Sequence, residues 1–218
     1  SEIPLTMTAD FSGNKLDNLV GSIVVENGFY KNRNGEFSLD GMALQSIIGG
    51  NINYLNFTSD FFDVKINGNY HFQDILTAFQ KSMDRYIPAL QYEKPPGTKE
   101  NKFGYQVDVK KLDELMTVFA PGYRVQTPFL LYGRLDSEQS VFEMKGKIPG
   151  FSTQNILIKD IIIGNSPQTG LYTSELSLGQ VELRNGMKIS NIKSNSKIAN
   201  NAIDDQREWG APDRKAYR

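Results

Sequence analysis

Residue types that catalyse reactions or bind metals are sparse in this chain. It has no cysteine and one histidine, His71, so it offers neither a thiolate nor a pair of imidazoles. His71 falls among the polar residues of an alternating segment, which predicts a solvated surface side chain. Asp108 and Asp113 flank a predicted turn without the spacing of a metal-binding loop. We therefore predict no enzyme, no cofactor and no metal site.

Two short motifs and the overall charge narrow the choice further. Gly49 and Gly50 lie between two predicted strands, whereas a phosphate-binding glycine loop opens a helix. Residues 56–58 match a glycosylation sequon, but such a match is common by chance. The chain has 24 basic and 25 acidic residues and no basic stripe, so we predict that nucleic acid is not a partner.

The chemistry that the sequence does offer is a periodic apolar surface. Residues 62–72 alternate between apolar and polar side chains, and residues 103–109 repeat this pattern. Alternation with a period of two predicts strands with one apolar face and one polar face. The candidate lining of a hydrophobic groove consists of Phe62, Val64, Ile66, Tyr70, Phe72, Phe103, Tyr105, Val107 and Val109. The alternative is that these side chains are ordinary core packed against helices.

The period changes to that of a helix in two places. Residues 73–87 place their apolar side chains within one arc, and residues 111–120 do the same before Pro121 and Gly122 end the pattern. The helical side chains expected to cover the groove are Leu76, Phe79, Met83, Leu112, Leu115 and Phe119. The alternative is that these helical side chains contact a bound ligand directly instead of only closing the groove.

The rest of the chain is rich in strand and turn signals. We predict strands at 19–26, 36–48, 51–58, 60–72, 103–109, 128–136, 140–148, 155–163, 171–178 and 180–193. A slip in the alternation at Gly41 predicts a β-bulge, and residues 93–102 are expected to form a crossing loop. Residues 1–193 are predicted to form one unit, followed by a polar tail at 194–218 that is loop or disordered.

Many one-sided strands leave more apolar surface than two short helices can hide. The chain can fold two sheets onto each other, close a barrel, or bend one sheet into a trough. The pattern alone favours the sandwich and the trough equally. The fold class that we predict is mainly β: an elongated, curved antiparallel β-groove, or β-taco, with two short amphipathic helices.

The compartment is constrained only weakly by the residues. The lack of cysteine fits a reducing compartment or a bacterial periplasm, and no run of about 18 apolar residues exists. The chain begins at Ser1 in a strand-like segment rather than a signal peptide. We therefore expect a mature form or a piece of a longer protein.

The order of several segments resembles the TamB family in the form found in Bacteroidetes-type bacteria. A strand with an early glycine at 19–25 precedes the segment 57–68, in which Ser59 and Asp60 lead into a hydrophobic strand. A helix with the spacing of Phe72, Ile75, Phe79 and Ser82 then follows. Residues 112–122 are similar to the family's second helix, and 128–135 to a later strand. Gly122 departs from the pattern, since the family usually has an acidic residue there. The resemblance covers roughly residues 16–163.

This resemblance implies an AsmA-like protein of the bacterial envelope, anchored in the inner membrane by a segment outside this chain, with its body in the periplasm. It implies an apolar groove for phospholipid acyl chains and movement of phospholipid toward the outer membrane. It also implies assembly of outer-membrane proteins with an Omp85-family partner. Two rivals to the lipid groove remain: a scaffold that pairs with strands of outer-membrane proteins, which the resemblance also implies, and a secreted β-sandwich binding module.

Overall fold

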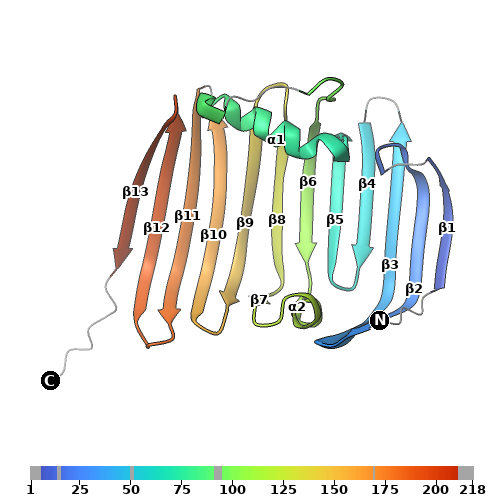
Figure 1. Cartoon of the computed structure of the whole chain (residues 1–218), viewed down its shortest axis with the longest axis horizontal. Helices are drawn as coiled ribbons and strands as arrows, with labels where there is room; N and C mark the ends of the chain where they lie inside the picture. The colour runs from blue at the N-terminus through green and yellow to red at the C-terminus, as the bar shows by residue number, and fades with distance from the viewer. Residues whose placement is uncertain (1–5, 14–15, 50–51, 91–94, 169, 211–218) are drawn as a thin grey trace.

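The computed structural model describes residues 6–13, 16–49, 52–90, 95–168 and 170–210, and these form one open, curled sheet of 13 strands (Figure 1). Every strand pair is antiparallel, and neighbours in the sheet are neighbours in the chain except around β7. The predicted fold class, a mainly β antiparallel groove with two short helices, is confirmed. The sandwich is wrong, because among the described residues no second sheet packs on the first.

The strand bounds are β1 (Thr6–Ser12), β2 (Val20–Asn32), β3 (Gly35–Gly49), β4 (Ile52–Ser59), β5 (Phe62–Asn69), β6 (Lys102–Val109), β7 (Arg124–Gln126), β8 (Phe129–Asp136), β9 (Val141–Ser152), β10 (Ile156–Gln168), β11 (Leu171–Leu183), β12 (Lys188–Ala199) and β13 (Ala202–Gly210). The helices are α1 (Ile75–Asp84) and α2 (Asp113–Phe119), and 3-10 turns occupy Leu16–Asn18, Phe72–Asp74 and Pro88–Leu90. The described part of the predicted crossing loop, residues 95–101, contains neither helix nor strand.

The predicted polar tail is wrong over most of its length. Residues 194–199 complete β12 and residues 202–210 form β13, while 211–218 lie outside the described residues. These strands escaped detection because their apolar side chains, among them Ile198, Ile203 and Trp209, are separated by polar residues on the same face, so the alternation that marks a half-buried strand is missing. The predicted strand 180–193 is also wrong, since β11 ends at Leu183 and β12 begins at Lys188.

One face of the sheet carries a row of apolar residues, which we call the apolar lane; at Gly146, which has no side chain, the Leu131 side chain covers the position. Cross-strand pairing places its members opposite one another from strand to strand. In order from β1 to β11 they are Ala9, Ile23, Leu44, Phe57, Val64, Val107, Leu131, Gly146, Ile163 and Leu176. The residues between them along each strand point to the other face, because side chains alternate.

A crease interrupts the ladder between β2 and β3. Pairing runs to Glu26 opposite Gly41 and resumes at Gly28 opposite Leu39, and Asn27 between them has a φ of 53°. The β-bulge predicted at Gly41 is wrong, because one residue is skipped on each strand and the register does not shift. The residue that adopts the left-handed conformation is Asn27 on the partner strand, as asparagine tolerates that conformation. The crease lets Leu39 and Leu44, of opposite parity, both pack toward the helices.

Both helices lie on the apolar face, at opposite ends of the strands (Figure 1). Ala78 of α1 packs in a cluster with Leu55, Tyr70, Phe103 and Leu135. The cluster under α2 comprises Phe37, Phe61 and Val118, with Tyr30, Leu39, Phe62 and Leu115 packed around it. The helices therefore cover the two margins of the face and leave the strands between them without a second layer among the described residues.

Candidate hydrophobic binding site

An apolar cavity of about 430 Å³ lies between α1 and the sheet. Its floor comes from β5, β6, β8 and β9, and its roof from one side of α1. The lining consists of Val64, Ile66, Ile75, Leu76, Phe79, Phe103, Tyr105, Val107, Leu135 and Phe142. No charged side chain takes part, so the cavity suits a hydrocarbon better than any polar ligand.

Tyr105 supplies the one hydroxyl of the lining, and that hydroxyl is already occupied. It donates a 3.0 Å hydrogen bond to the Glu143 carbonyl oxygen, and burial raises the pKa of Tyr105 to about 12. The ring can lie across β8 because the residue opposite it there is Gly133. A Cβ at Gly133 would stand 1.8 Å from the Glu143 carbonyl oxygen and 2.8 Å from the Tyr105 hydroxyl.

We expect Gly133→Ala to lower the free energy of unfolding by about 1–3 kcal/mol, the usual cost of overpacking. The added methyl group must displace either the β9 backbone or the Tyr105 ring. Gly164→Ala is the matched control, because a Cβ there meets nothing within 4 Å. Urea denaturation of both variants measures the difference. Equal stability of the two variants would contradict the close packing of Tyr105 over β8.

The structure brings together five of the nine predicted groove residues. Val64, Ile66, Phe103, Tyr105 and Val107 all line the cavity. The alternation of β5 and β6 was sufficient to identify them, because the two strands are neighbours in the sheet.

The other four predicted groove residues lie outside this cavity. Phe62 packs in the α2 cluster, and Val109 is buried at the same end of the sheet, where the two residues pair. Tyr70 is completely buried under α1, and Phe72 packs beside it with ring centroids 5.1 Å apart. These four residues pack in or beside the clusters under the helices, as the alternative of ordinary core predicts, because the helices cover the ends of β5 and β6.

The predicted cover residues of α1 divide into two kinds. Leu76 and Phe79 line the cavity, and Leu76 remains 68% exposed at its rim. Phe79 meets the Phe142 ring edge-on, with centroids 4.9 Å apart. Met83 is half-buried and does not line the cavity. Phe142 and Leu135 were not predicted as lining, because the sequence does not reveal that α1 crosses to β8 and β9.

Of the three α2 residues predicted to cover the groove, one packs in the α2 cluster and two cover the sheet only in part. Leu115 packs in the α2 cluster, and Leu112 is the half-buried residue before the first turn. Phe119 is 61% exposed, although its ring stacks on Tyr30 at 5.4 Å. Val118, which was not predicted, is the buried residue of this helix at 1% exposure.

A polar network ties α1 to the loop before β6. The Lys81 ammonium donates to both Glu100 carboxylate oxygens, at 2.8 and 2.9 Å, and the Ser137 hydroxyl donates to the same carboxylate at 2.6 Å. The Asn101 side-chain oxygen accepts the His71 backbone N–H at 2.7 Å. At the far end the Tyr86 hydroxyl donates to the Ser140 carbonyl oxygen. These contacts hold α1 at a fixed distance from the sheet, above the cavity.

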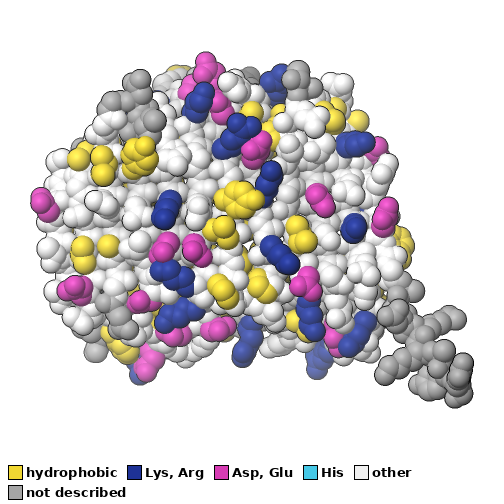
Figure 2. All heavy atoms as spheres, turned by 180° about the vertical axis from the view of Figure 1, so that it is seen from behind, with side chains coloured by type: hydrophobic (Ala, Val, Ile, Leu, Met, Phe, Trp, Pro, Cys, Tyr) yellow, Lys and Arg dark blue, Asp and Glu magenta, His cyan; other side chains and the backbone are white. Residues whose placement is uncertain are grey.

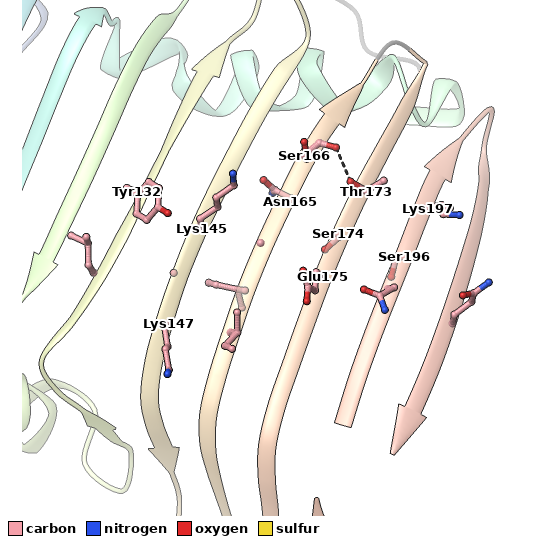
Figure 3. A pocket seen from close by; sticks show the side chains of 17 residues that line it. Tyr132, Lys145, Lys147, Asn165, Ser166, Thr173, Ser174, Glu175, Ser196 and Lys197 are labelled. Carbon is pink, nitrogen blue, oxygen red and sulfur yellow. Dashed lines mark hydrogen bonds between the residues drawn. The ribbon is translucent and has the colours of Figure 1, made fainter. Parts of the chain in front are cut away.

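The opposite face of the sheet is chemically different. Charged side chains are spread across it, and hydrophobic side chains occur only in separate small groups (Figure 2). A second hollow of about 860 Å³ on this side mixes Tyr132 and Ile162 with Lys145, Glu175 and Lys197 (Figure 3). An acyl chain in this hollow would meet charged side chains between the apolar ones, whereas the apolar lane on the other face contains no charged residue.

His71 is half-buried rather than fully exposed, and its Nδ1 is shielded from solvent without a hydrogen-bond partner among the described residues. Within the described ranges no group of three or more histidine, cysteine, aspartate and glutamate residues could hold a metal ion. Neither helix there has the length and hydropathy needed to cross a membrane.

Comparisons with protein-family models, with curated proteins and with solved structures found no match to this chain.

Proposed function

We propose that this chain is a segment of a TamB-like envelope protein whose apolar face carries phospholipid acyl chains toward the outer membrane. The observation that carries the proposal is the apolar lane, which runs from β1 to β11 and passes under α1 through Val64 and Val107. Its members in the middle of the sheet are half-buried, and Leu176 is 39% exposed. They are neither sealed in a core nor mixed with charge.

The hydrophobic effect explains why continuity of this surface matters. Each CH₂ group removed from water contributes about 0.8 kcal/mol, so a chain of ~16 carbons loses on the order of 10 kcal/mol when it enters water. An acyl chain that moves along the lane from Leu44 to Leu176 keeps apolar contact at each strand. A single charged strand in the path would restore most of that barrier.

Native mass spectrometry of the purified chain tests the proposal, after incubation with vesicles of phosphatidylethanolamine and phosphatidylglycerol and removal of the vesicles. We expect adducts with the masses of intact phospholipids. A spectrum of the lipid-free chain alone, from protein that is folded by circular dichroism, would overturn it.

A second candidate function is a scaffold for outer-membrane protein strands, and the edges of the sheet favour it. Within the described sheet, β1 and β13 each pair with one neighbour only, so each presents an unpaired ladder to a further strand. β13 also exposes Ile203 and Trp209, at 65% and 69%. Photo-crosslinking from these two positions in envelope extracts would recover outer-membrane proteins if the scaffold function holds, together with an Omp85-family partner. Recovery of lipid alone would reject it.

In either case we propose a periplasmic location, as part of a protein anchored in the inner membrane by a segment outside this chain. The lipid function is preferred because the lane is a property of ten paired strands, whereas open edges are common to any unclosed sheet.

A further inference from the structure

The two ends of the apolar lane differ in polarity. At β1 the face is apolar to the edge, where Met7 and Phe11 are 59% and 47% exposed. At the other end Ile203 on this face of β13 is also exposed, but the row that contains Leu176 continues to Ser194 on β12 and Arg207 on β13. The next row toward α1 ends in the same way, at Ser196 and Asp205.

These four residues form a connected cluster, which we call the polar stop. The Ser194 and Ser196 hydroxyls donate to the same Asp205 oxygen at 2.6 and 3.0 Å, and the Arg207 Nε–H donates to the other oxygen at 2.5 Å. These hydrogen bonds lower the pKa of Asp205, with Ser194 the largest cause, so its carboxylate is ionised at neutral pH.

In the polar stop the guanidinium of Arg207 is accessible to solvent, and the carboxylate of Asp205 is largely shielded. The Arg207 side chain is 70% exposed, whereas the Asp205 side chain is 18% exposed. The Arg207 Nε–H is the donor that meets Asp205, which leaves the two terminal NH₂ groups directed away from this hydrogen bond. A guanidinium with accessible donors beside a carboxylate matches the phosphate and ammonium of a zwitterionic headgroup.

The distance from the polar stop to the cavity suits one lipid. Neighbouring strands lie about 4.8 Å apart, so the path from Arg207 on β13 to Gly146 on β9 or Leu131 on β8 is roughly 19–24 Å. One leaflet of a bilayer with its headgroups is about 20 Å thick. A lipid whose phosphate meets Arg207 therefore ends its acyl chains over β9 or β8, where Leu131 pairs with Val107 of the cavity floor.

We propose that the polar stop is a headgroup station for zwitterionic phospholipid, with the phosphate on Arg207, the ammonium beside Asp205 and the acyl chains along the lane toward α1. This inference rests on the proposed lipid function. It adds that the lipid lies across the strands in one orientation, with the headgroup at β12 and β13, and that headgroup charge affects which lipid is held.

The test uses vesicles with equal amounts of phosphatidylethanolamine and phosphatidylglycerol that carry the same acyl chains. After incubation the protein is separated from the vesicles, and its bound lipids are extracted and measured by mass spectrometry. We expect the unmodified chain to hold phosphatidylethanolamine about threefold or more above phosphatidylglycerol, the discrimination that one or two net hydrogen bonds provide. Asp205→Asn should bring this ratio to about one, because Asp205 faces the ammonium that phosphatidylglycerol lacks, while total bound lipid changes less than about twofold.

Lys197→Gln is the matched control, since Lys197 lies on the opposite face of β12 and should leave the ratio unchanged. The outcomes separate the two proposals. Bound lipid with the same composition in the unmodified chain and in Asp205→Asn would overturn the headgroup station and leave the lipid groove standing. Absence of lipid from the unmodified chain would overturn the proposed function itself.

Discussion

Val107→Asp should reduce the phospholipid bound by the purified chain by about tenfold or more. Val107 stands in the apolar lane between Val64 and Leu131 and forms part of the cavity floor. A carboxylate there must lose water when an acyl chain covers it, and burial of an unpaired charge costs several kcal/mol. A loss of about 1.4 kcal/mol is already tenfold in affinity. Native mass spectrometry after incubation with phospholipid vesicles measures the effect.

The control for this prediction comes from the adjacent residue. Gln106 is exposed on the opposite face of β6, so Gln106→Asp introduces the same charge one position away. It should bind lipid like the unmodified chain. Should Val107→Asp fail to fold by circular dichroism, Val107→Thr replaces it, since it keeps the shape and adds one hydroxyl. Equal lipid binding by a folded Val107 variant and by Gln106→Asp would show that the lane is not the acyl-chain path.

Tyr70→Ala should lower the free energy of unfolding by about 3–5 kcal/mol, the cost of removing a large buried ring. Tyr70 is 0% exposed and joins Leu55, Ala78 and Phe103 in the cluster that holds α1 on the sheet. The cavity left behind would lie under α1, where the helix cannot collapse without breaking its tie to Glu100. Urea denaturation measures the free energy of unfolding.

Tyr70→Phe should behave in the opposite way. Burial raises the pKa of Tyr70, partly offset by the nearby Ser46 hydroxyl, yet neither hydroxyl reaches hydrogen-bond geometry. The Tyr70 hydroxyl is buried without a hydrogen-bond partner among the described residues, and removing it avoids its desolvation cost. This variant should therefore be as stable as the unmodified chain or more so, by up to about 1 kcal/mol. A loss of several kcal/mol in Tyr70→Phe would mean that the hydroxyl, rather than the ring, secures α1.

The sequence was informative wherever one face of a strand is buried and the other is wet. The alternation in β5 and β6 predicted two strands with one apolar face and the five cavity-lining residues on them, because register follows from which side chains must avoid water. It did not distinguish a groove from a sandwich. The helical arcs predicted α1 and α2 for the same reason. These are local patterns that short-range spacing can report.

Features that depend on distant contacts were not predictable. Phe142 enters the cavity because α1 extends over β8 and β9, which is a matter of helix direction rather than local pattern. Val118 is buried instead of Phe119 because the Asn32 and Asn34 side chains both donate to its carbonyl oxygen and fix the helix against the β2–β3 turn. β13 was missed because the face that carries Ile203 continues with Asp205 and Arg207, so this edge strand has no apolar period.

The most direct test of an acyl-chain groove on this sheet is a contact map made with a phospholipid that carries a photoactivatable diazirine at the end of one acyl chain. After irradiation of the folded protein with bound lipid, mass spectrometry of peptides identifies the labelled residues. We predict labels on Val107, Leu131 and Phe142, which face the lane or the cavity, and none on their neighbours Gln106 and Tyr132. Labels distributed equally over both faces of β6 and β8, or absent from both, would contradict the groove.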